Sequence, residues 1–398
     1  KRQGAIQHLY DDEQLTFEDL QEILQRALLG KLEGFVQSKL IEKTDGQNCT
    51  LTVKNSETLI HVSKGKVPLT DESIQSRYAG NPGLVETFTR AKETLEFIFS
   101  KVKNLNHIFD NGEIYLSMEL LNSKNRNVIW YSEQPLIQCH CFARNEDGVQ
   151  TSWTPGISSL LQEIESIPGI EDRYYQVIGP VELHYKDDFT VNAKVHGSIQ
   201  NKISKLLSEN NLTAKSKIED YYIEAFKKIA KKQFTGLSPE TTNYLATRWG
   251  TAKKSNLLNS KTIKEKQLLP AIKDYDRVEA WNKATELKDR LKEIVLLTGT
   301  YTLKMLEGNL CTDEQHACKL IQADYDKIQK ELNTYSKEDQ AYIQRMEELL
   351  VNSGGIENFR PIEGIVFKFK GEQRKLCNSF SIINQILGIQ RYRKLGGE

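Results

Sequence analysis

A lysine, an aspartate and a glycine stand close together at Lys43, Asp45 and Gly46. Covalent transfer of a nucleotide needs an amine nucleophile on a stiff strand end, an acid that holds the amine, and a glycine that lets the backbone approach a phosphate. The three residues supply these features in that order, so we predict that Lys43 is the nucleophile. The pattern alone is weak evidence, because about one chain in ten of this length contains it by chance.

The same residues also fit a surface hairpin turn. Asp-Gly is the commonest signal for a tight β-hairpin, and Val53 and Ile60 belong to alternating runs that are typical of strands. The short motif by itself therefore leaves both interpretations open.

A second signal lies far downstream, where Glu363-Gly364 precedes a β-branched strand that carries Lys368. Another strand follows and contains Lys375. A Glu-Gly-Ile-Val-x-Lys run occurs by chance in about one chain in a thousand. Finding both segments in this order favours a nucleotide-transfer site over an isolated turn.

The two segments resemble motifs I and IV of the covalent nucleotidyltransferase superfamily, which includes ATP-dependent nucleic-acid ligases and mRNA-capping enzymes. The closest resemblance is to a phage-type RNA ligase. Residues 112–120 resemble motif III, a strand whose glutamate binds the ribose of the nucleotide. The resemblance assigns this role to Glu119, with Glu113 as the alternative.

Residues 136–142 resemble the next strand of the family, whose aromatic residue stacks on the purine. Phe142 is the candidate for this stacking, and Tyr131 is the alternative. Lys64 stands where the family usually carries an arginine, so it is a substitute for that residue. We also assign Glu42 and Gly46, which flank the nucleophile motif, to nucleotide binding.

The last motif departs from the family pattern. The family has Lys-x-Lys, whereas here Lys375 is followed two positions later by Cys377. One phosphate contact is therefore missing from this motif, and Lys368 is the residue that could replace it.

The resemblance implies a reaction in which Lys43 attacks ATP, pyrophosphate leaves and a Lys43-AMP phosphoramide forms. Glu363 would hold Mg²⁺, and the AMP would pass to a 5′-phosphate end that a 3′-hydroxyl then joins. A lysine with a pKa near 10.4 is protonated at neutral pH. We therefore expect Lys368 and Lys375 to lower the pKa of Lys43 by repulsion.

The composition is that of a chain with no membrane segment. Its 398 residues suffice for two or three domains, and Lys plus Arg equal Asp plus Glu at 54 each. We find neither a long apolar run nor a signal-peptide pattern, which predicts a cytoplasmic protein, in the host cytoplasm if the chain is viral. The six cysteines show no disulfide framework and no usual zinc spacing, which favours free thiols.

The predicted class is α+β, with a mixed or antiparallel nucleotidyltransferase core covered by helices. Residues 1–189 form the first part of this core and residues 356–398 its last strands. Residues 190–355 have long helical patterns, which predict an α-helical insertion domain. The expected elements include helices over 17–28 and 84–102, strands near 113–121, 127–132 and 136–143, and helix breaks at Gly250, Gly299 and other glycines and prolines.

The predicted insertion carries a local excess of positive charge. Residues 201–266 contain 14 basic residues against six acidic ones. A basic block interleaved with aromatic residues is a candidate surface for nucleic acid, and a solvated helix face over core aromatics is the alternative. The basic candidates are Lys227, Lys228, Lys231, Lys232, Lys253 and Lys254, and the aromatic ones are Tyr221, Tyr222, Phe234 and Trp249.

Three functions fit these observations. The first is an ATP-dependent polynucleotide ligase acting on RNA, since the given sequence after Lys375 is too short for the OB-fold that follows the core in DNA ligases and capping enzymes. The second is another nucleotidyl transfer, such as adenylylation of a protein or a small molecule. The third is a binding or structural protein, such as a phage component, on a ligase scaffold that has lost its activity.

Overall fold

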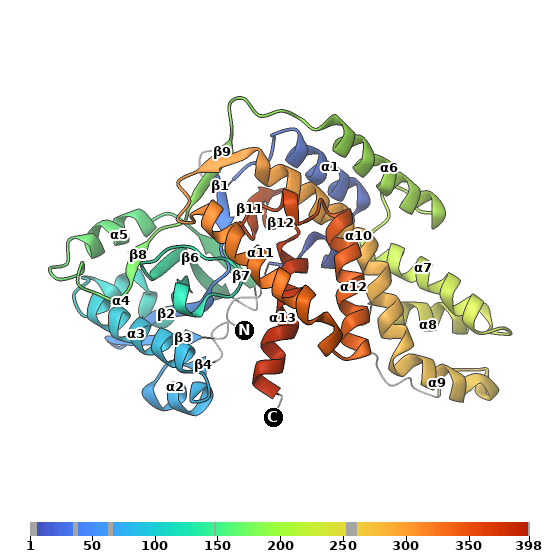
Figure 1. Ribbon diagram of the computed structural model, residues 1–398, viewed down its shortest axis with the longest axis horizontal. Coiled ribbons are helices and arrows are strands. Elements are labelled where there is room, and N and C mark those ends of the chain that lie inside the picture. The colour runs from blue at the N-terminus through green and yellow to red at the C-terminus, as the bar shows by residue number, and fades with distance from the viewer. Residues whose placement is uncertain (1–5, 35–38, 63–66, 147–148, 252–260, 397–398) are drawn as a thin grey trace.

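The computed structural model describes residues 6–34, 39–62, 67–146, 149–251 and 261–396. Two β-sheets and the helices around them make up this part of the chain (Figure 1). The predicted α+β class with mainly antiparallel sheets is therefore confirmed.

One sheet has five antiparallel strands in the order β10-β9-β1-β11-β12. Its strands are β1 (Leu40–Lys43), β9 (Glu182–Tyr185), β10 (Leu306–Gly308), β11 (Gly364–Phe369) and β12 (Glu372–Cys377). Helices from both halves of the chain share its hydrophobic core: α1 (Phe17–Leu28), α6 (Ala193–Glu209), α10 (Glu279–Lys304), α11 (Glu314–Glu331), α12 (Lys337–Asn352) and α13 (Phe380–Gly396). Because β1 pairs with β11, this sheet joins the first and last parts of the chain.

The second sheet has the order β4-β3-β2-β5-β6-β7, with β8 parallel to β6. Its strands are β2 (Gln47–Lys54), β3 (Glu57–Val62), β4 (Val67–Pro68), β5 (Ile114–Leu121), β6 (Leu136–Glu146), β7 (Val149–Trp153) and β8 (Gln176–Ile178). Four helices accompany it: α2 (Asp71–Tyr78), α3 (Pro82–Phe99), α4 (Leu105–Ile108) and α5 (Ile157–Glu165). Apolar residues of α2, α3 and α5 and of one sheet face form a second core.

The described part of residues 190–355 is mainly helical, as predicted, but it also contributes β10 to the five-stranded sheet. Most of its helices share the core of that sheet. A smaller third core joins α7 (Ile218–Gln233), α8 (Pro239–Thr251), α9 (Leu269–Arg277) and the first turns of α10. These three helices lie at one end of the molecule, at the right of Figure 1.

Local sequence signals account for several of these elements. Thr16 caps α1, because its hydroxyl accepts a hydrogen bond of 3.1 Å from the backbone N–H of Asp19. Asn55 and Ser56 form the turn between β2 and β3 with positive φ values of 51° and 64°. The predicted strand over 127–132 is wrong, since this segment is irregular.

Gly299 was expected to break a helix, and that prediction is wrong, because Gly299 lies inside α10. A Cβ atom at this position would lie 1.9 Å from the carbonyl oxygen of Cys377. The glycine therefore allows α10 to approach the end of β12 closely. Gly250 has a similar role inside α8, where a Cβ would lie 2.9 Å from the carbonyl oxygen of Tyr222.

We expect Gly299→Ala to lower the free energy of unfolding by at least about 2 kcal/mol, because the new methyl group overlaps the backbone of β12. Gly197→Ala is the control. Gly197 lies inside α6 with no neighbouring atom near its Cβ position, so Ala there should stabilise the protein by about 0.5–1 kcal/mol. Urea denaturation measures both effects, and equal effects would contradict the role given to Gly299.

Candidate functional site

The nucleophile motif crosses from one sheet to the other. Strand β1 ends at Lys43 and pairs with β9 and β11, whereas β2 begins at Gln47 and pairs with β3 and β5. The residues between them therefore connect two sheets and do not form a hairpin turn. This geometry excludes the alternative interpretation of Asp45-Gly46 as the tip of a surface hairpin.

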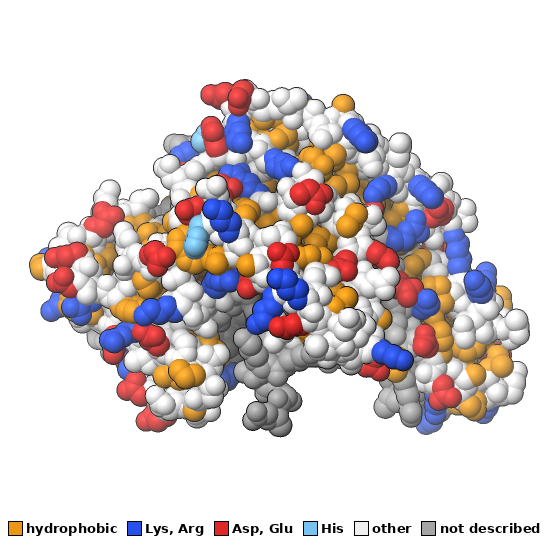
Figure 2. Space-filling model, in the orientation of Figure 1, with side chains coloured by type: hydrophobic (Ala, Val, Ile, Leu, Met, Phe, Trp, Pro, Cys, Tyr) orange, Lys and Arg blue, Asp and Glu red, His pale blue; other side chains and the backbone are white. Residues whose placement is uncertain are grey.

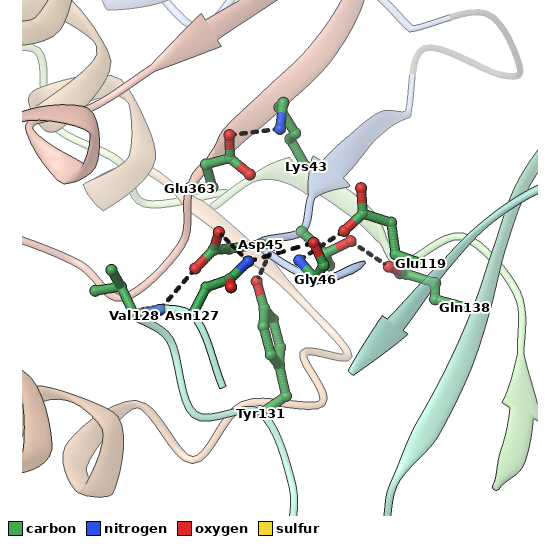
Figure 3. A network of polar contacts seen from close by, with 10 residues as sticks. Lys43, Asp45, Gly46, Glu119, Asn127, Val128, Tyr131, Gln138 and Glu363 are labelled. Atoms are coloured by element: carbon green, nitrogen blue, oxygen red, sulfur yellow. Dashed lines mark hydrogen bonds and ion pairs between the residues drawn. The ribbon is translucent and has the colours of Figure 1, made fainter. Parts of the chain in front are cut away.

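Lys43 and Glu363 form an ion pair at this junction, although they are 320 positions apart in the chain (Figure 3). Lys43 is paired with Gly364 in the β1–β11 register, so Glu363 directly precedes the strand beside the lysine. The side chains of Lys43 and Glu363 are 26% and 15% exposed. The structure thus brings the two halves of the predicted motif pair into contact.

The electrostatic surroundings of Lys43 differ from those we expected. Burial lowers the pKa of Lys43, but the charge of Glu363 and, more weakly, those of Cys377 and Glu119 outweigh burial and raise this pKa above its ordinary value. In the protein alone Lys43 is therefore a stable ammonium ion. A ligand must change this balance before the amine can attack.

Lys368 does not lie with Lys43, which corrects its assignment as a catalytic cation. It pairs with Gln373, and its backbone N–H donates a 2.8 Å hydrogen bond to the carbonyl of Glu33. It lies four residues beyond Gly364 on β11, or about 13 Å along the strand. The side chain is exposed at this distant end of the sheet.

Glu119 reaches the motif from β5. Its Oε2 accepts a 2.6 Å hydrogen bond from the backbone N–H of Gly46. A Cβ on Gly46 would lie 2.8 Å from this carboxylate oxygen and 2.7 Å from the carbonyl of Leu120, so the contact requires glycine. Burial raises the pKa of Glu119 to about 8, although Lys43 opposes this rise. Glu113 is exposed six residues away at the other end of β5.

Asp45 does not hold the lysine; it anchors the segment that follows β5. Its carboxylate accepts hydrogen bonds from the Val128 N–H at 2.9 Å and from Asn127 Nδ2 at 3.2 Å. The Asp45 N–H donates to the hydroxyl of Tyr131 at 2.6 Å. Tyr131 therefore positions the Lys43-Asp45-Gly46 motif. The segment around Tyr131 is not a strand because Val128 within it uses its backbone N–H to bind Asp45.

Lys375 lies on the same face of the five-stranded sheet as Lys43. Cys377 is opposite Gly364, which is opposite Lys43, and Lys375 is two residues before Cys377 on β12. Lys375 is 7% exposed, and burial, helped by the charge of Lys43, lowers its pKa although Cys377, Glu363 and Asp11 oppose this. Lys43, Gly364 and Cys377 thus lie side by side across three strands, in one row of the sheet. Cys377 stands at the position where the family pattern has its second lysine.

Phe142 is a core residue, which corrects its assignment to purine stacking. Its ring packs against Phe109 and Trp153 in the core of the second sheet. The register shift of β6 opposite Ser117 and Met118 leaves His140 as the extra residue of a bulge. Burial and then the charge of Lys43 lower the pKa of His140 to about 4, and the bulge places His140 on β6 opposite the strand that carries Glu119.

The sequence Cys139-His140-Cys141 fits ordinary strand alternation, so it does not mark His140 as a residue of the site. A bulge interrupts this alternation, and the sequence contains no signal for it. His8 is a second missed residue. Burial, then the charges of Lys375 and Lys43, lower the pKa of His8 to about 3, and the short helix η1 (Leu9–Asp11) that follows His8 packs against β12, which carries Lys375.

Glu42 lies on the opposite face of β1 from Lys43, because successive strand residues alternate. It is 1% exposed, and neither carboxylate oxygen has a hydrogen-bond partner among the described residues. Burial raises the pKa of Glu42 to about 8, although the charge of Arg360 opposes this rise. Its position on the core side of the sheet does not support the nucleotide-binding role that we assigned to it.

The buried carboxyl of Glu42 makes stability depend on pH. The unfolded chain loses this proton near pH 4.3, whereas the folded protein keeps it up to about pH 8, so this group favours folding less as pH rises between these values. Glu42→Gln removes the titration. We expect the variant to gain on the order of 3 kcal/mol relative to the wild type between pH 5 and pH 8. Urea titrations at both pH values measure this, with the exposed Glu182→Gln as control.

The lysines of the basic block differ in their contacts and in their exposure to solvent. Lys64, Lys253 and Lys254 lie outside the described residues. Lys227 forms a 2.5 Å ion pair with Glu224, and Lys228 donates to the last turn of α6 at the carbonyl of Glu209. The Lys and Arg side chains around α7 to α9 are interspersed with acidic ones (Figure 2). Lys231 and Lys232 are exposed.

The aromatic residues of the block are core residues, so they offer no stacking surface. Tyr221, Tyr222, Phe234 and Trp249 are each at most 6% exposed. Trp249 packs against Phe234 and Tyr275 inside the third core. For the aromatic residues, the alternative of core packing is therefore confirmed.

Within the described parts of the chain, no group of three His, Cys, Asp or Glu side chains is arranged to hold a metal ion. All six cysteines are free thiols. In the same parts of the chain, no helix combines the length and the apolar character needed to cross a membrane.

The residues that converge are therefore Lys43, Glu363, Glu119 and Lys375, with Asp45 and Tyr131 fixing the backbone between the sheets. His140 and His8 join them from segments that the motif search did not consider. This arrangement combines a lysine amine with carboxylates and a second cation, which suits chemistry on a phosphate ester.

The chain matches no family model and no curated protein.

Proposed function

We propose that the chain is an ATP-dependent nucleotidyltransferase that joins RNA ends through a covalent lysyl-AMP. The observation that carries the proposal is the Lys43–Glu363 ion pair at the junction of the two sheets. Both residues stand in the segments whose sequences resemble the nucleotidyltransferase motifs, and Glu119 of the third resembling segment contacts Gly46. The resemblance implies a mixed or antiparallel β core with helices, and the chain has mainly antiparallel sheets with helices around them.

In the proposed first step, Nζ of Lys43 attacks the α-phosphorus of ATP. The bond from the α-phosphorus to the bridging oxygen breaks, and pyrophosphate leaves as the nitrogen–phosphorus bond forms. Oε1 of Glu363 accepts the hydrogen bond of Nζ, so it can receive the proton that the amine must lose. Lys375, on the same face of the sheet, would stabilise the negative charge on the phosphate.

Mg²⁺ is the metal that the proposed reaction requires. Glu363 and Glu119 fit it, because each has a carboxylate oxygen beyond the one that binds Lys43 or Gly46, and Mg²⁺ prefers such oxygens. Mg²⁺ is usually held by one or two carboxylates together with substrate phosphates. A site of that kind needs no group of three protein ligands. Bound there, the metal would neutralise charge on the phosphates.

In the later steps, AMP would move from Lys43 to the 5′-phosphate of an RNA strand and form a pyrophosphate linkage. A 3′-hydroxyl would then attack that 5′-phosphate, and AMP would leave as the strands join. The test uses ATP labelled in the α-phosphate. A labelled protein band after denaturation supports the first step, and loss of that label on adding 5′-phosphorylated RNA supports the second.

RNA binding by α7 predicts an effect of the exposed Lys231 and Lys232. Changing both to Gln should weaken RNA binding and lower the slope of log affinity against log salt by up to about 1.4, with nearly unchanged helix propensity. The yield of labelled protein should not change, since α7 lies away from β1 (Figure 1). An unchanged affinity and slope across a salt series would remove α7 from the RNA surface.

A second candidate is a nucleotide-binding or structural protein without transfer activity. Cys377 favours it, because a buried thiol stands in the row of Lys43 where the resembling family has a lysine. The measurement that separates the two is ATP binding in the absence of a covalent adduct. Binding without any labelled protein over a range of Mg²⁺ concentrations and pH values would support this second candidate.

A further inference from the structure

Two largely buried lysines near the candidate site make no direct ion pair in the described part of the chain, although Asp11 acts on both, Asp289 on Lys292 and Glu363 on Lys375 from farther away. Among the residues that the structure describes, neither Lys375 on β12 nor Lys292 on α10 has an ion pair or a hydrogen bond through Nζ. Burial lowers the pKa of both side chains. Because buried charges are normally paired, two unpaired lysines in one region are unusual and indicate an anion that binds there.

The other charged residues around Lys292 are already paired. Arg345 holds Asp289 at 2.6 Å, and Lys288 lies 3.7 Å from Asp11. Asp289 and Asp11 thus form ion pairs with other cations, and although their charges also act on Lys292, its ammonium group contacts the ring of Tyr10, at 5.7 Å from the centroid.

Arg374 of β12 is likewise paired with Asp12. Lys288, Arg345 and Arg374 therefore have direct ion pairs, whereas Lys292 and Lys375 have none among the described residues and can each take an anion from a ligand.

His8 connects the two lysines. Its ring stacks on Tyr10 with a centroid distance of 4.8 Å and an interplanar angle of 10°. The charges of Lys375, Lys43 and Lys292 all act on His8, and the Tyr10 ring on which His8 stacks is also the ring that Lys292 contacts. The short helix η1 (Leu9–Asp11), α10 and β12 pack against one another, which fixes this arrangement.

We propose that Lys292, Lys375 and His8 form a subsite for the two phosphates that leave as pyrophosphate. This inference rests on the proposed function, because it places the α-phosphate at Lys43 and the rest of the polyphosphate beyond it. Two ammonium groups offset much of the negative charge of a pyrophosphate, and an imidazole N–H can donate a further hydrogen bond. The long helix α10 would thereby contribute directly to the nucleotide site.

Calorimetric titration with inorganic pyrophosphate tests the subsite without any chemistry at Lys43. We expect the wild type to bind pyrophosphate, Lys292→Gln to raise its Kd about tenfold or more, and Lys292→Arg to keep most of the affinity. Lys283→Gln is the matched control, since Lys283 is an exposed lysine on the same helix that pairs with Glu286. Thermal melting curves of each variant report whether it is folded.

The outcomes separate this inference from the proposed function. If labelled protein forms with ATP but Lys292→Gln binds pyrophosphate like the wild type, the subsite is wrong and the function stands. If pyrophosphate binding depends on Lys292 but no adduct forms, the subsite stands and the covalent step is wrong. An equal loss in Lys283→Gln would also overturn the subsite, because the effect would then not be local.

Discussion

Replacing Lys43 by Ala or by Arg should abolish the covalent adduct with ATP, whereas the wild type should give an acid-labile, hydroxylamine-sensitive band. Alanine has no amine. Arginine keeps the positive charge that pairs with Glu363, but it cannot be deprotonated in a protein and so cannot attack phosphorus. Denaturing electrophoresis after incubation with α-labelled ATP and Mg²⁺ measures the adduct.

Lys39→Arg is the matched control for this experiment. Lys39 directly precedes β1 and forms an exposed ion pair with Glu182 at 2.5 Å, so the substitution changes a lysine–carboxylate pair outside the site. We expect its adduct yield to equal that of the wild type. A band of normal intensity in both Lys43 variants would place the nucleophile elsewhere and overturn the proposed chemistry.

The sequence was a good guide where local chemistry decides the structure. The cap at Thr16 and the apolar periodicity after it define α1, and the turn at Asn55-Ser56 defines the β2–β3 hairpin. Gly299 shows why other predictions failed. A glycine in a helical pattern suggests a break, but here it is required by the contact with Cys377, which lies 78 positions away and is invisible to local patterns.

Some residues of the candidate site could likewise be predicted from sequence motifs, whereas others depend on contacts between distant segments. Lys43, Glu119 and Glu363 were predicted from motifs, and the structure brings them together because β1, β5 and β11 meet at the sheet junction. The roles of Asp45 and Tyr131 could not be predicted, since their hydrogen bonds cross the irregular segment after β5. The position of His140 depends on a β-bulge, and that of Lys292 depends on how α10 packs. Neither feature has a recognisable sequence pattern.

Glu363→Gln should have two opposite effects on Lys43. The Glu363 carboxylate raises the pKa of Lys43, so its removal should lower the pH at which Lys43 becomes reactive by about 1 to 2 units. An amine-reactive ester, with mass spectrometry of the peptide that contains Lys43, measures this reactivity. The adduct yield with ATP should nevertheless fall by at least about 100-fold, because the proton acceptor and the proposed metal ligand are lost.

Because Glu363→Gln should increase the reactivity of Lys43 but decrease the adduct yield, the experiment separates a catalytic role of Glu363 from a structural one. A residue that only supports the fold would, when changed, reduce the adduct without making Lys43 more nucleophilic at lower pH. Glu182→Gln removes a carboxylate from a neighbouring strand of the same sheet, where it pairs with Lys39, and should change neither measurement. If Glu363→Gln left both the reactivity of Lys43 and the adduct yield unchanged, the ion pair would have no part in catalysis, and the observation that carries the proposed function would be lost.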